Sequence, residues 1–342
     1  VLVTGGAGFI GSNLVDRLLE LGYRVRIFDN LATGSIRNAP LHHDRVEFVL
    51  GDIMSFEEVD KAMQHVEYVY HLAAMSKVLP SLKNPGMAKF CTEVNAIGTW
   101  NVLEAARLHK IKKVVYAASS TYYGRNPVPN TETDAPDFLT PYAASKYEGE
   151  IQMKMFNDLF GVPTVSLRFF MVYGPRQPST GAYAIVTGVF AKQAGMNQPL
   201  TIEGSGNHTR DFIHVKDINE GLIVAQQSDI SGEVINLGTG VDFSVKQVAD
   251  LVSSNQVNVA ERKNDLLATL ADTCKMKKTL KYKPTKDFKI EMSKIAKETM
   301  AGQIYAQSWL TTEVQMSAPW VLPPRYEVRS RFGVAYVLLQ QC

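Results

Sequence analysis

A tyrosine and a lysine four residues apart are the first pair in the sequence whose types and spacing could do chemistry. Tyr142 and Lys146 open an uninterrupted helical stretch, in which residues i and i+4 lie on one helix face. A neighbouring ammonium favours the phenolate, so Lys146 should lower the pKa of Tyr142 toward that of a general base. A second pair with this spacing, Tyr282 and Lys286, brackets Pro284, which breaks a helix. The first pair is the candidate, although an ordinary surface pair has the same spacing.

Three hydroxyl residues in a row, Ser119-Ser120-Thr121, follow the strand predicted over residues 113–117. Ligands of open α/β sheets bind outside the carboxyl ends of the strands. We therefore expect a hydroxyl here, that of Ser119 first, to bridge a substrate and Tyr142.

A glycine pattern, Gly5-x-x-Gly8-x-x-Gly11, lies between a predicted strand and a predicted helix. Gly5 permits a tight turn, Gly8 lets the backbone approach a pyrophosphate, and Gly11 lets the helix pack close to the strand. Asp29 ends the next predicted strand, where a carboxylate can accept hydrogen bonds from an adenosine ribose and would repel a 2′-phosphate. Loop and carboxylate together predict NAD rather than NADP. A glycine-rich turn without function is the alternative for the loop alone.

Short β-branched strands alternate with helices through the first half of the chain, which predicts a parallel sheet covered on both faces. The fold class is therefore α/β, a Rossmann-type doubly wound sheet over residues 1–173. Short glycine-punctuated elements over 174–300 predict a smaller C-terminal α/β substrate lobe, with some segments crossing between the lobes. Residues 301–342 show no interpretable periodicity and are left unassigned. The strands are predicted at residues 1–3, 24–28, 46–50, 68–72 and 113–117, with the longest helices near 94–109 and 141–160.

The 342 residues have an ordinary globular composition, with 45% hydrophobic and 20% charged residues and a formal net charge of +2. This balance predicts no nucleic-acid partner and no membrane partner. Nine lysines between 275 and 297 fit a solvated helical face better than a nucleic-acid patch. Three scattered cysteines favour a reducing, cytoplasmic location and no metal site. The first 15 residues lack the features of a signal peptide, and a few residues are expected to precede Val1.

Many landmarks in order resemble the extended short-chain dehydrogenases/reductases, within them the nucleotide-sugar 4-epimerase family that acts on UDP-glucose or UDP-N-acetylglucosamine. The resemblance runs from Val1 to about Lys297. Besides the glycine loop and Tyr142 to Lys146, it rests on Asp29-Asn30-Leu31, Gly51-Asp52, His71-Leu72-Ala73-Ala74, Asn95-x-x-Gly98-Thr99, Ser119 to Gly124, Tyr173-Gly174-Pro175-Arg176, Arg210 to Val215 and Asn236-Leu237-Gly238.

The resemblance implies tightly held NAD, a second lobe that grips a nucleoside diphosphate, and a catalytic triad of Ser119, Tyr142 and Lys146. The positions that it assigns to NAD are Gly5, Gly8, Phe9, Ile10, Gly11, Asp29, Asn30, Gly34, Asp52, Ile53, Leu72, Ala73, Ala74, Asn95, Tyr142, Lys146 and Phe169. The positions that it assigns to substrate are Ser120, Thr121, Met171, Arg210, Arg262, Asp265 and Thr269.

The residues after the catalytic serine bear on the reaction. Dehydratases of the family carry Asp-Glu there, whereas this chain has Ser120 and Thr121, which cannot eliminate water as a carboxyl pair would. The remaining chemistry is oxidation at the sugar C4, rotation of the transient 4-keto intermediate, and return of the hydride to its other face. This favours an NAD-dependent 4-epimerase of a UDP-hexose. A dehydratase, reductase or uronate-modifying enzyme and a catalytically silent NAD-binding protein are the alternatives.

Five positions bear on the substrate. Met171 stands where the family usually has an Asn that donates a hydrogen bond to the diphosphate, which Met cannot do. Arg210 and the Arg262-x-x-Asp265 motif match the family's phosphate and ribose contacts. Four residues after Asp265, Thr269 replaces a Tyr that closes the sugar's C2 side, so we expect room for an N-acetyl group.

The resemblance also implies a homodimer, in which the helix after Asn95 and the helix opening at Tyr142 pair across a two-fold axis. Ile151, Met155 and Leu159 form an apolar stripe on the later helix. The same stripe would also serve to pack that helix on its own sheet.

Overall fold

Seven parallel strands form the central sheet of the computed structural model, which describes residues 1–76, 78–181, 184–260, 266–301, 328–330 and 333–335. Their order is β10-β6-β5-β4-β1-β2-β3, and every neighbouring pair is parallel. The order reverses between β1 and β4, and open α/β sheets bind ligands outside the carboxyl ends of the strands at such a point. The predicted Rossmann-type sheet is confirmed. Its strands are β1 (Leu2–Thr4), β2 (Val25–Asp29), β3 (Val46–Leu50), β4 (Tyr68–His71), β5 (Lys113–Ser119), β6 (Thr164–Phe169) and β10 (Glu233–Leu237).

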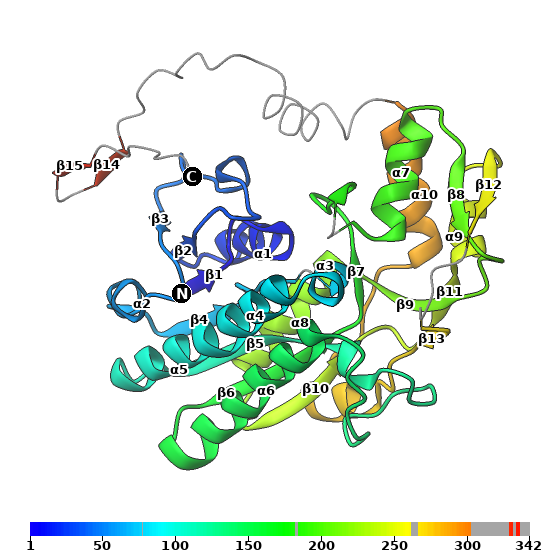
Figure 1. Ribbon diagram of the computed structural model, residues 1–342. Coiled ribbons are helices and arrows are strands. Elements are labelled where there is room, and N and C mark those ends of the chain that lie inside the picture. Colours follow the sequence, from blue (N-terminus) through cyan, green and yellow to red (C-terminus); the bar gives the residue numbers. More distant parts are fainter. Residues whose placement is uncertain (77, 182–183, 261–265, 302–327, 331–332, 336–342) are drawn as a thin grey trace.

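Helices cover both faces of this sheet (Figure 1). Successive residues of a strand point to opposite faces, so Val114 packs in one apolar cluster and Val115 in the other. The first face carries α2 (Phe56–Met63), α5 (Gly98–Leu108) and α6 (Pro141–Phe160), with α3 (Val78–Lys83), α4 (Pro85–Thr92) and a π-helical turn (Glu93–Ile97) beside α6. The second face carries α1 (Phe9–Glu20) and α8 (Val215–Gln227).

The long helix α6 has sharp ends that its sequence explains. The Thr140 hydroxyl accepts a hydrogen bond from the Ala143 N–H at 3.0 Å, and Pro141 occupies the first turn. Gly161, in the left-handed conformation with φ 68°, ends the helix. At Gly149 a Cβ would lie 2.4 Å from the Tyr116 hydroxyl, so only glycine lets α6 approach β5 this closely. The first two turns of α6 are thereby set against the carboxyl end of β5.

A smaller lobe packs around its own apolar cluster, which contains Phe190, Phe212, Phe288 and Met292. Its strand β9 pairs with β7, β11 and β13, while β8 and β12 pair with each other. Its elements are β7 (Met171–Tyr173), α7 (Val186–Gly195), β8 (Leu200–Glu203), β9 (Thr209–His214), β11 (Asp242–Ser244), α9 (Val245–Val252), β12 (Gln256–Val259), β13 (Ala268–Thr269) and α10 (Phe288–Met300).

The chain crosses between the two lobes. Helix α8 and strand β10 lie beyond residue 173 but belong to the first lobe, where β10 forms an edge of the large sheet. A π-helical turn (Met276–Leu280) also packs against the first lobe. Of residues 301–342 the structure describes Ala301 and the hairpin of β14 (Val328–Ser330) and β15 (Gly333–Ala335). Among the described helices, none combines the length and apolarity needed to span a membrane.

Candidate active site

Three buried side chains meet where β5 ends beside the first turns of α6. Ser119 is the last residue of β5, while Tyr142 and Lys146 lie one turn apart on α6. The Ser119 hydroxyl lies close enough to Tyr142 to lower the pKa of that phenol. The structure thus brings the predicted triad together at the carboxyl edge of the sheet.

Burial governs the charges of these groups. It raises the pKa of Tyr142 to about 12, and the Ser119 hydroxyl opposes this rise. It lowers the pKa of Lys146 to about 7, and the Glu150 carboxylate opposes this fall. The Lys146 Nζ lies 4.0 Å from the centre of the Tyr116 ring, whose face stabilises a cation. The expected lowering of the Tyr142 pKa is wrong for this structure, because desolvation outweighs the opposing effect of the Ser119 hydroxyl.

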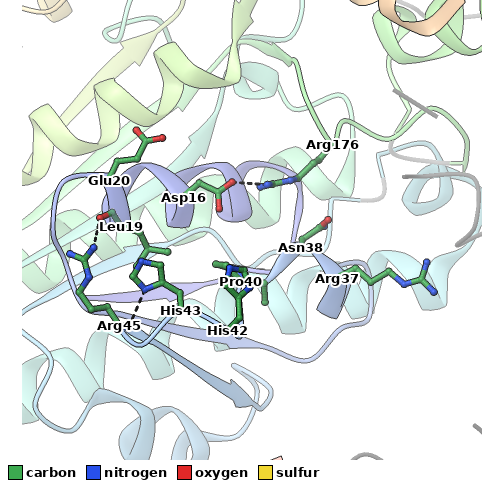
Figure 2. A pocket seen from close by; sticks show the side chains of 11 residues that line it. Asp16, Leu19, Glu20, Arg37, Asn38, Pro40, His42, His43, Arg45 and Arg176 are labelled. Atoms are coloured by element: carbon green, nitrogen blue, oxygen red, sulfur yellow. Dashed lines mark hydrogen bonds and ion pairs between the residues drawn. The ribbon is translucent and has the colours of Figure 1, made fainter. Parts of the chain in front are cut away.

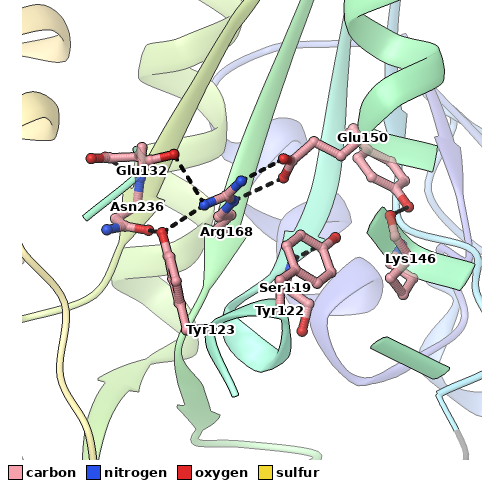
Figure 3. A network of polar contacts seen from close by, with 9 residues as sticks. Ser119, Tyr122, Tyr123, Glu132, Lys146, Glu150, Arg168 and Asn236 are labelled. Carbon is pink, nitrogen blue, oxygen red and sulfur yellow. Dashed lines mark hydrogen bonds and ion pairs between the residues drawn. The ribbon is translucent and has the colours of Figure 1, made fainter. Parts of the chain in front are cut away.

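A buried ion pair lies in the same polar network as Ser119 and Lys146 (Figure 3). Arg168 of β6 makes two bonds to the Glu150 carboxylate, at 2.7 and 3.0 Å, and both side chains are only 5% exposed. Another guanidinium nitrogen donates to the Tyr123 hydroxyl at 2.9 Å, and Tyr123 donates to Asn236 at 2.5 Å. Sequence reasoning missed Glu150, although its spacing four residues after Lys146 is visible. Its partner on β6 could not be paired with it from the sequence.

The glycine loop has the shape that a pyrophosphate requires. A Cβ on Gly5, which has φ 70°, would lie 2.8 Å from the Ala73 nitrogen, and one on Gly11 would lie 2.2 Å from the Gly5 oxygen. Gly8 is the N-cap of α1, with no side-chain cap and no acidic residue in the first turn. The N–H groups of Phe9 and Ile10 therefore begin a helix that can accept an anion.

Asp29 is buried beside this loop. Its carboxylate accepts the Ala7 N–H at 2.9 Å and the Leu31 N–H at 2.8 Å. Burial raises its pKa, and these two hydrogen bonds oppose the rise. Each carboxylate oxygen keeps a further lone pair, so Asp29 can also accept from a ribose hydroxyl.

The next predicted NAD positions line the same edge. Asn30 donates to the Asp52 carboxylate at 2.9 Å, and a Cβ on Gly34 would lie 2.9 Å from the Ala7 backbone. Ile53 is buried at the foot of α5, against Gly98. Together these contacts hold the segments after β2 and β3 beside the glycine loop.

Hydrogen bonds from two side chains, those of Thr4 and Asn95, hold the segment after β4 in place. The Thr4 hydroxyl accepts from the N–H groups of Leu72 and Ala73, each at 3.2 Å. Asn95 pairs with the Met75 backbone at 2.8 and 3.0 Å and donates to the Ser145 hydroxyl at 2.9 Å. The Asn95 amide, predicted to touch NAD, therefore positions the chain around Ala74 and the first turn of α6.

Part of the predicted substrate set lies together in the smaller lobe. Thr269 pairs with Arg210 across β13 and β9. The buried Asp211 carboxylate accepts from the N–H groups of Thr239, Gly240 and Ala271, which joins three segments around Arg210.

The remaining predicted residues are placed as follows. Ser120 and Thr121 form the turn after Ser119, and the Thr121 hydroxyl lies 2.9 Å from the Ser119 hydroxyl. Phe169 is buried at the end of β6, whereas half-buried Met171 packs against the core of the smaller lobe. Arg262 and Asp265 lie outside the described residues.

A separate cleft of about 680 Å³ lies on the flank of α1 (Figure 2). Its lining includes His42, His43 and Arg45, together with Arg176, which pairs with Asp16 at 2.6 Å. No member of the triad lines this cleft, so it is not the place where the triad acts. In the part of the chain that the structure describes, no group of three or more His, Cys, Asp or Glu could hold a metal ion.

Known proteins share this fold and these motifs. The chain matches the NAD dependent epimerase/dehydratase family over residues 1–238. It is 39% identical over 255 residues to a putative UDP-glucose 4-epimerase of Methanocaldococcus jannaschii, covering 74% of this chain and 81% of the relative. Other relatives are named as a UDP-N-acetyl-alpha-D-glucosaminuronate decarboxylase and a UDP-glucuronate 4-epimerase.

Solved structures of nucleotide-sugar epimerases have a similar fold. A UDP-N-acetylglucosamine 4-epimerase from Methanobrevibacter ruminantium, in complex with UDP-N-acetylmuramic acid, superposes with a TM-score of 0.82 at 32% identity, covering 88% of this chain and 98% of that one. A UDP-glucose 4-epimerase of Thermotoga maritima with UDP-glucose has a TM-score of 0.82 at 30% identity and the same coverage. Because the family match spans both the glycine loop and the triad, this chain belongs to the NAD dependent epimerase/dehydratase family of extended short-chain dehydrogenases/reductases, and its cofactor is NAD.

Proposed function

We propose that this chain is an NAD-dependent 4-epimerase of a UDP-hexose. The observation that carries the proposal is the meeting of three buried side chains, Ser119, Tyr142 and Lys146, at the same sheet edge as the glycine loop. Ser120 and Thr121 follow the serine, so the turn supplies hydroxyls and no carboxyl pair for removing water. This residue set suits reversible oxidation at one carbon.

The residues have separate roles in this reaction. The glycine loop and Asp29 would hold NAD, which would supply the reversible hydride transfer at the sugar C4 when bound. Tyr142 takes the proton of the C4 hydroxyl and later gives it back. Lys146 in its charged form would offset part of the desolvation that raises the Tyr142 pKa, and Ser119 donates a hydrogen bond to the reacting oxygen.

The substrate is inferred from the smaller lobe. Arg210 presents a guanidinium, which suits a diphosphate, and Thr269 lies beside it on β13. Threonine occupies less space than the tyrosine that closes this position in some members of the family. We therefore infer that UDP-N-acetylglucosamine is turned over alongside or better than UDP-glucose, and that Thr269→Tyr removes the N-acetylated activity selectively. Equal loss of both activities would contradict this assignment.

One experiment tests the proposal. Purified protein is incubated separately with UDP-glucose, UDP-N-acetylglucosamine and UDP-glucuronate, and the nucleotide sugars are separated by chromatography. The 4-epimer of one of the first two should form, and Tyr142→Phe should abolish its formation while NAD binding persists. Conversion of UDP-glucuronate alone, or loss of water or carbon dioxide from any substrate, would overturn the proposal.

A homodimer is part of the proposal. Of the apolar stripe on α6, Ile151 and Leu159 are 53% and 69% exposed, whereas Met155 packs against the apolar cluster of its own sheet face; Trp100 on α5 is 43% exposed. The exposed positions favour a partner surface over packing of the whole stripe on its own sheet. A second copy would cover them with the same two helices across a two-fold axis. The cytoplasmic location stays a prediction.

A further inference from the structure

Two consecutive buried tyrosines follow the catalytic serine and have different hydroxyl partners (Figure 3). The Tyr122 hydroxyl turns back and accepts a hydrogen bond from the backbone N–H of Ser119 at 3.1 Å. The Tyr123 hydroxyl instead contacts Arg168 and Asn236, on the side of the network away from the serine. The side chains of Tyr122 and Tyr123 are 1% and 2% exposed.

We propose that Tyr122 is a positioning residue for catalysis, whose hydroxyl holds the Ser119 backbone so that the serine hydroxyl points at Tyr142 and the reacting oxygen. This inference rests on the proposed epimerase function, because it deepens the role of Ser119.

Backbone hydrogen bonds fix the position of Ser119. Ser119 is the N-cap of the 3₁₀ turn Ser120–Tyr123, and its hydroxyl oxygen accepts from the N–H of Thr121 at 3.2 Å and from the N–H of Tyr122. In return Tyr122 accepts the Ser119 N–H, which is a capping box made with a tyrosine. A hydroxyl has one proton to donate and two lone pairs. Since backbone N–H groups use the lone pairs, the serine proton is left for one of two neighbouring hydroxyls, that of Thr121 at 2.9 Å or that of Tyr142.

The Tyr122 ring has little freedom to move. It packs edge-on against Tyr147, with ring centres 5.2 Å apart, and the Arg168 guanidinium lies 5.4 Å from its centre. Arg168 is itself held by the two bonds to Glu150. Because the Tyr122 ring is held in place on two sides, its hydroxyl meets the Ser119 N–H without a loss of conformational entropy during the reaction.

Tyr122 does not compete with Tyr142 as the base. Burial raises the pKa of Tyr122 well above its ordinary value, so its hydroxyl stays protonated at neutral pH. Its only contact with the triad among the hydrogen bonds described is with the Ser119 turn. Its effect on the reaction therefore passes through Ser119.

The test compares Tyr122→Phe with the matched control Tyr123→Phe. Each variant loses one buried hydroxyl from the same turn, but only the first loses the contact to Ser119. In Tyr122→Phe, kcat should fall about tenfold or more, with KM within about twofold of the wild type, because the serine is misplaced by a fraction of an ångström. The acid limb of its pH–rate profile should move to higher pH. The Ser119 hydroxyl lowers the pKa of Tyr142, so a misplaced serine leaves that pKa higher. Tyr123→Phe should keep the wild-type pH profile.

Hydrogen exchange gives a readout that does not depend on turnover. The Ser119 amide should exchange faster in Tyr122→Phe than in wild type and in Tyr123→Phe. Equal exchange in all three proteins, or equal kinetic losses in the two variants, would overturn the role of Tyr122. If the wild type converts no UDP-hexose while the Ser119 amide responds as expected, the proposed function fails and the positioning contact stands.

Discussion

Replacing Lys146 with methionine should change how protein stability depends on pH. Burial lowers the pKa of Lys146 from its ordinary 10.5 to about 7, and the side chain is only 3% exposed. Below pH 7 the lysine is charged in both the folded and the unfolded chain, so folding bears the full cost of burying a charge. Above pH 7 the folded chain releases the proton while the unfolded chain keeps it. The contribution of Lys146 to the free energy of unfolding therefore rises with pH between about 7 and 10.5.

The size of the effect follows from the same shift. Each pH unit in that window is equivalent to about 1.4 kcal/mol. Between pH 6 and pH 9 the wild type should therefore gain about 3 kcal/mol of unfolding free energy relative to Lys146→Met. The variant lacks the titrating group, so the difference between the two proteins isolates Lys146 from every other group that titrates.

The assay is urea denaturation of both proteins at pH 6, 7, 8 and 9, after bound nucleotide has been removed. Lys154→Met is the matched control, because Lys154 lies two turns along the same helix, is 60% exposed and pairs with Asp158. Lys154 is charged in both states over this range, so its replacement should leave the pH dependence unchanged. A difference between wild type and Lys146→Met that does not vary with pH would refute the reasoning.

Three further predictions concern cofactor choice, the buried ion pair and assembly. Asp29→Ser should narrow the preference for NAD over NADP in a binding titration, since the variant lacks the carboxylate that repels a 2′-phosphate; equal affinities in the wild type would contradict this. Glu150→Gln should lower the free energy of unfolding, measured in urea, by about 3 kcal/mol, because the buried Arg168 keeps its charge and loses the carboxylate that balances it. An unchanged free energy of unfolding would show that the ion pair does not stabilise the fold. Leu159→Lys should lower the molar mass measured by light scattering from that of a dimer to that of a monomer. A wild-type protein with the mass of a monomer would contradict the proposed dimer.

Local patterns predicted most of the first lobe. The alternation of strands and helices and the glycine loop depend on neighbouring residues, and these predicted strands lie within a residue or two of the observed ones. The helix predicted at 94–109 is interrupted, because a π-helical turn places Asn95 against Met75 before α5 begins. Such a turn leaves no clear pattern in the sequence.

The features that were missed depend on distant contacts. Strand β10 lies more than 60 residues after β6 yet pairs with it, so its place in the first lobe follows from tertiary packing. The pair of Glu150 with Arg168 joins a helix to a strand, and the contact of Tyr122 with Ser119 needs the exact geometry of a turn. The residue types were visible in the sequence, but their partners were not.

The most direct test of the central claim is turnover in heavy water. UDP-glucose and UDP-N-acetylglucosamine are incubated with the purified protein in D₂O, and the 4-epimer is examined by mass spectrometry and proton NMR. If the C4 hydrogen leaves and returns as a hydride while Tyr142 moves only the hydroxyl proton, the product keeps its original hydrogen at C4. Deuterium at C4, or no 4-epimer from either substrate, would contradict the account.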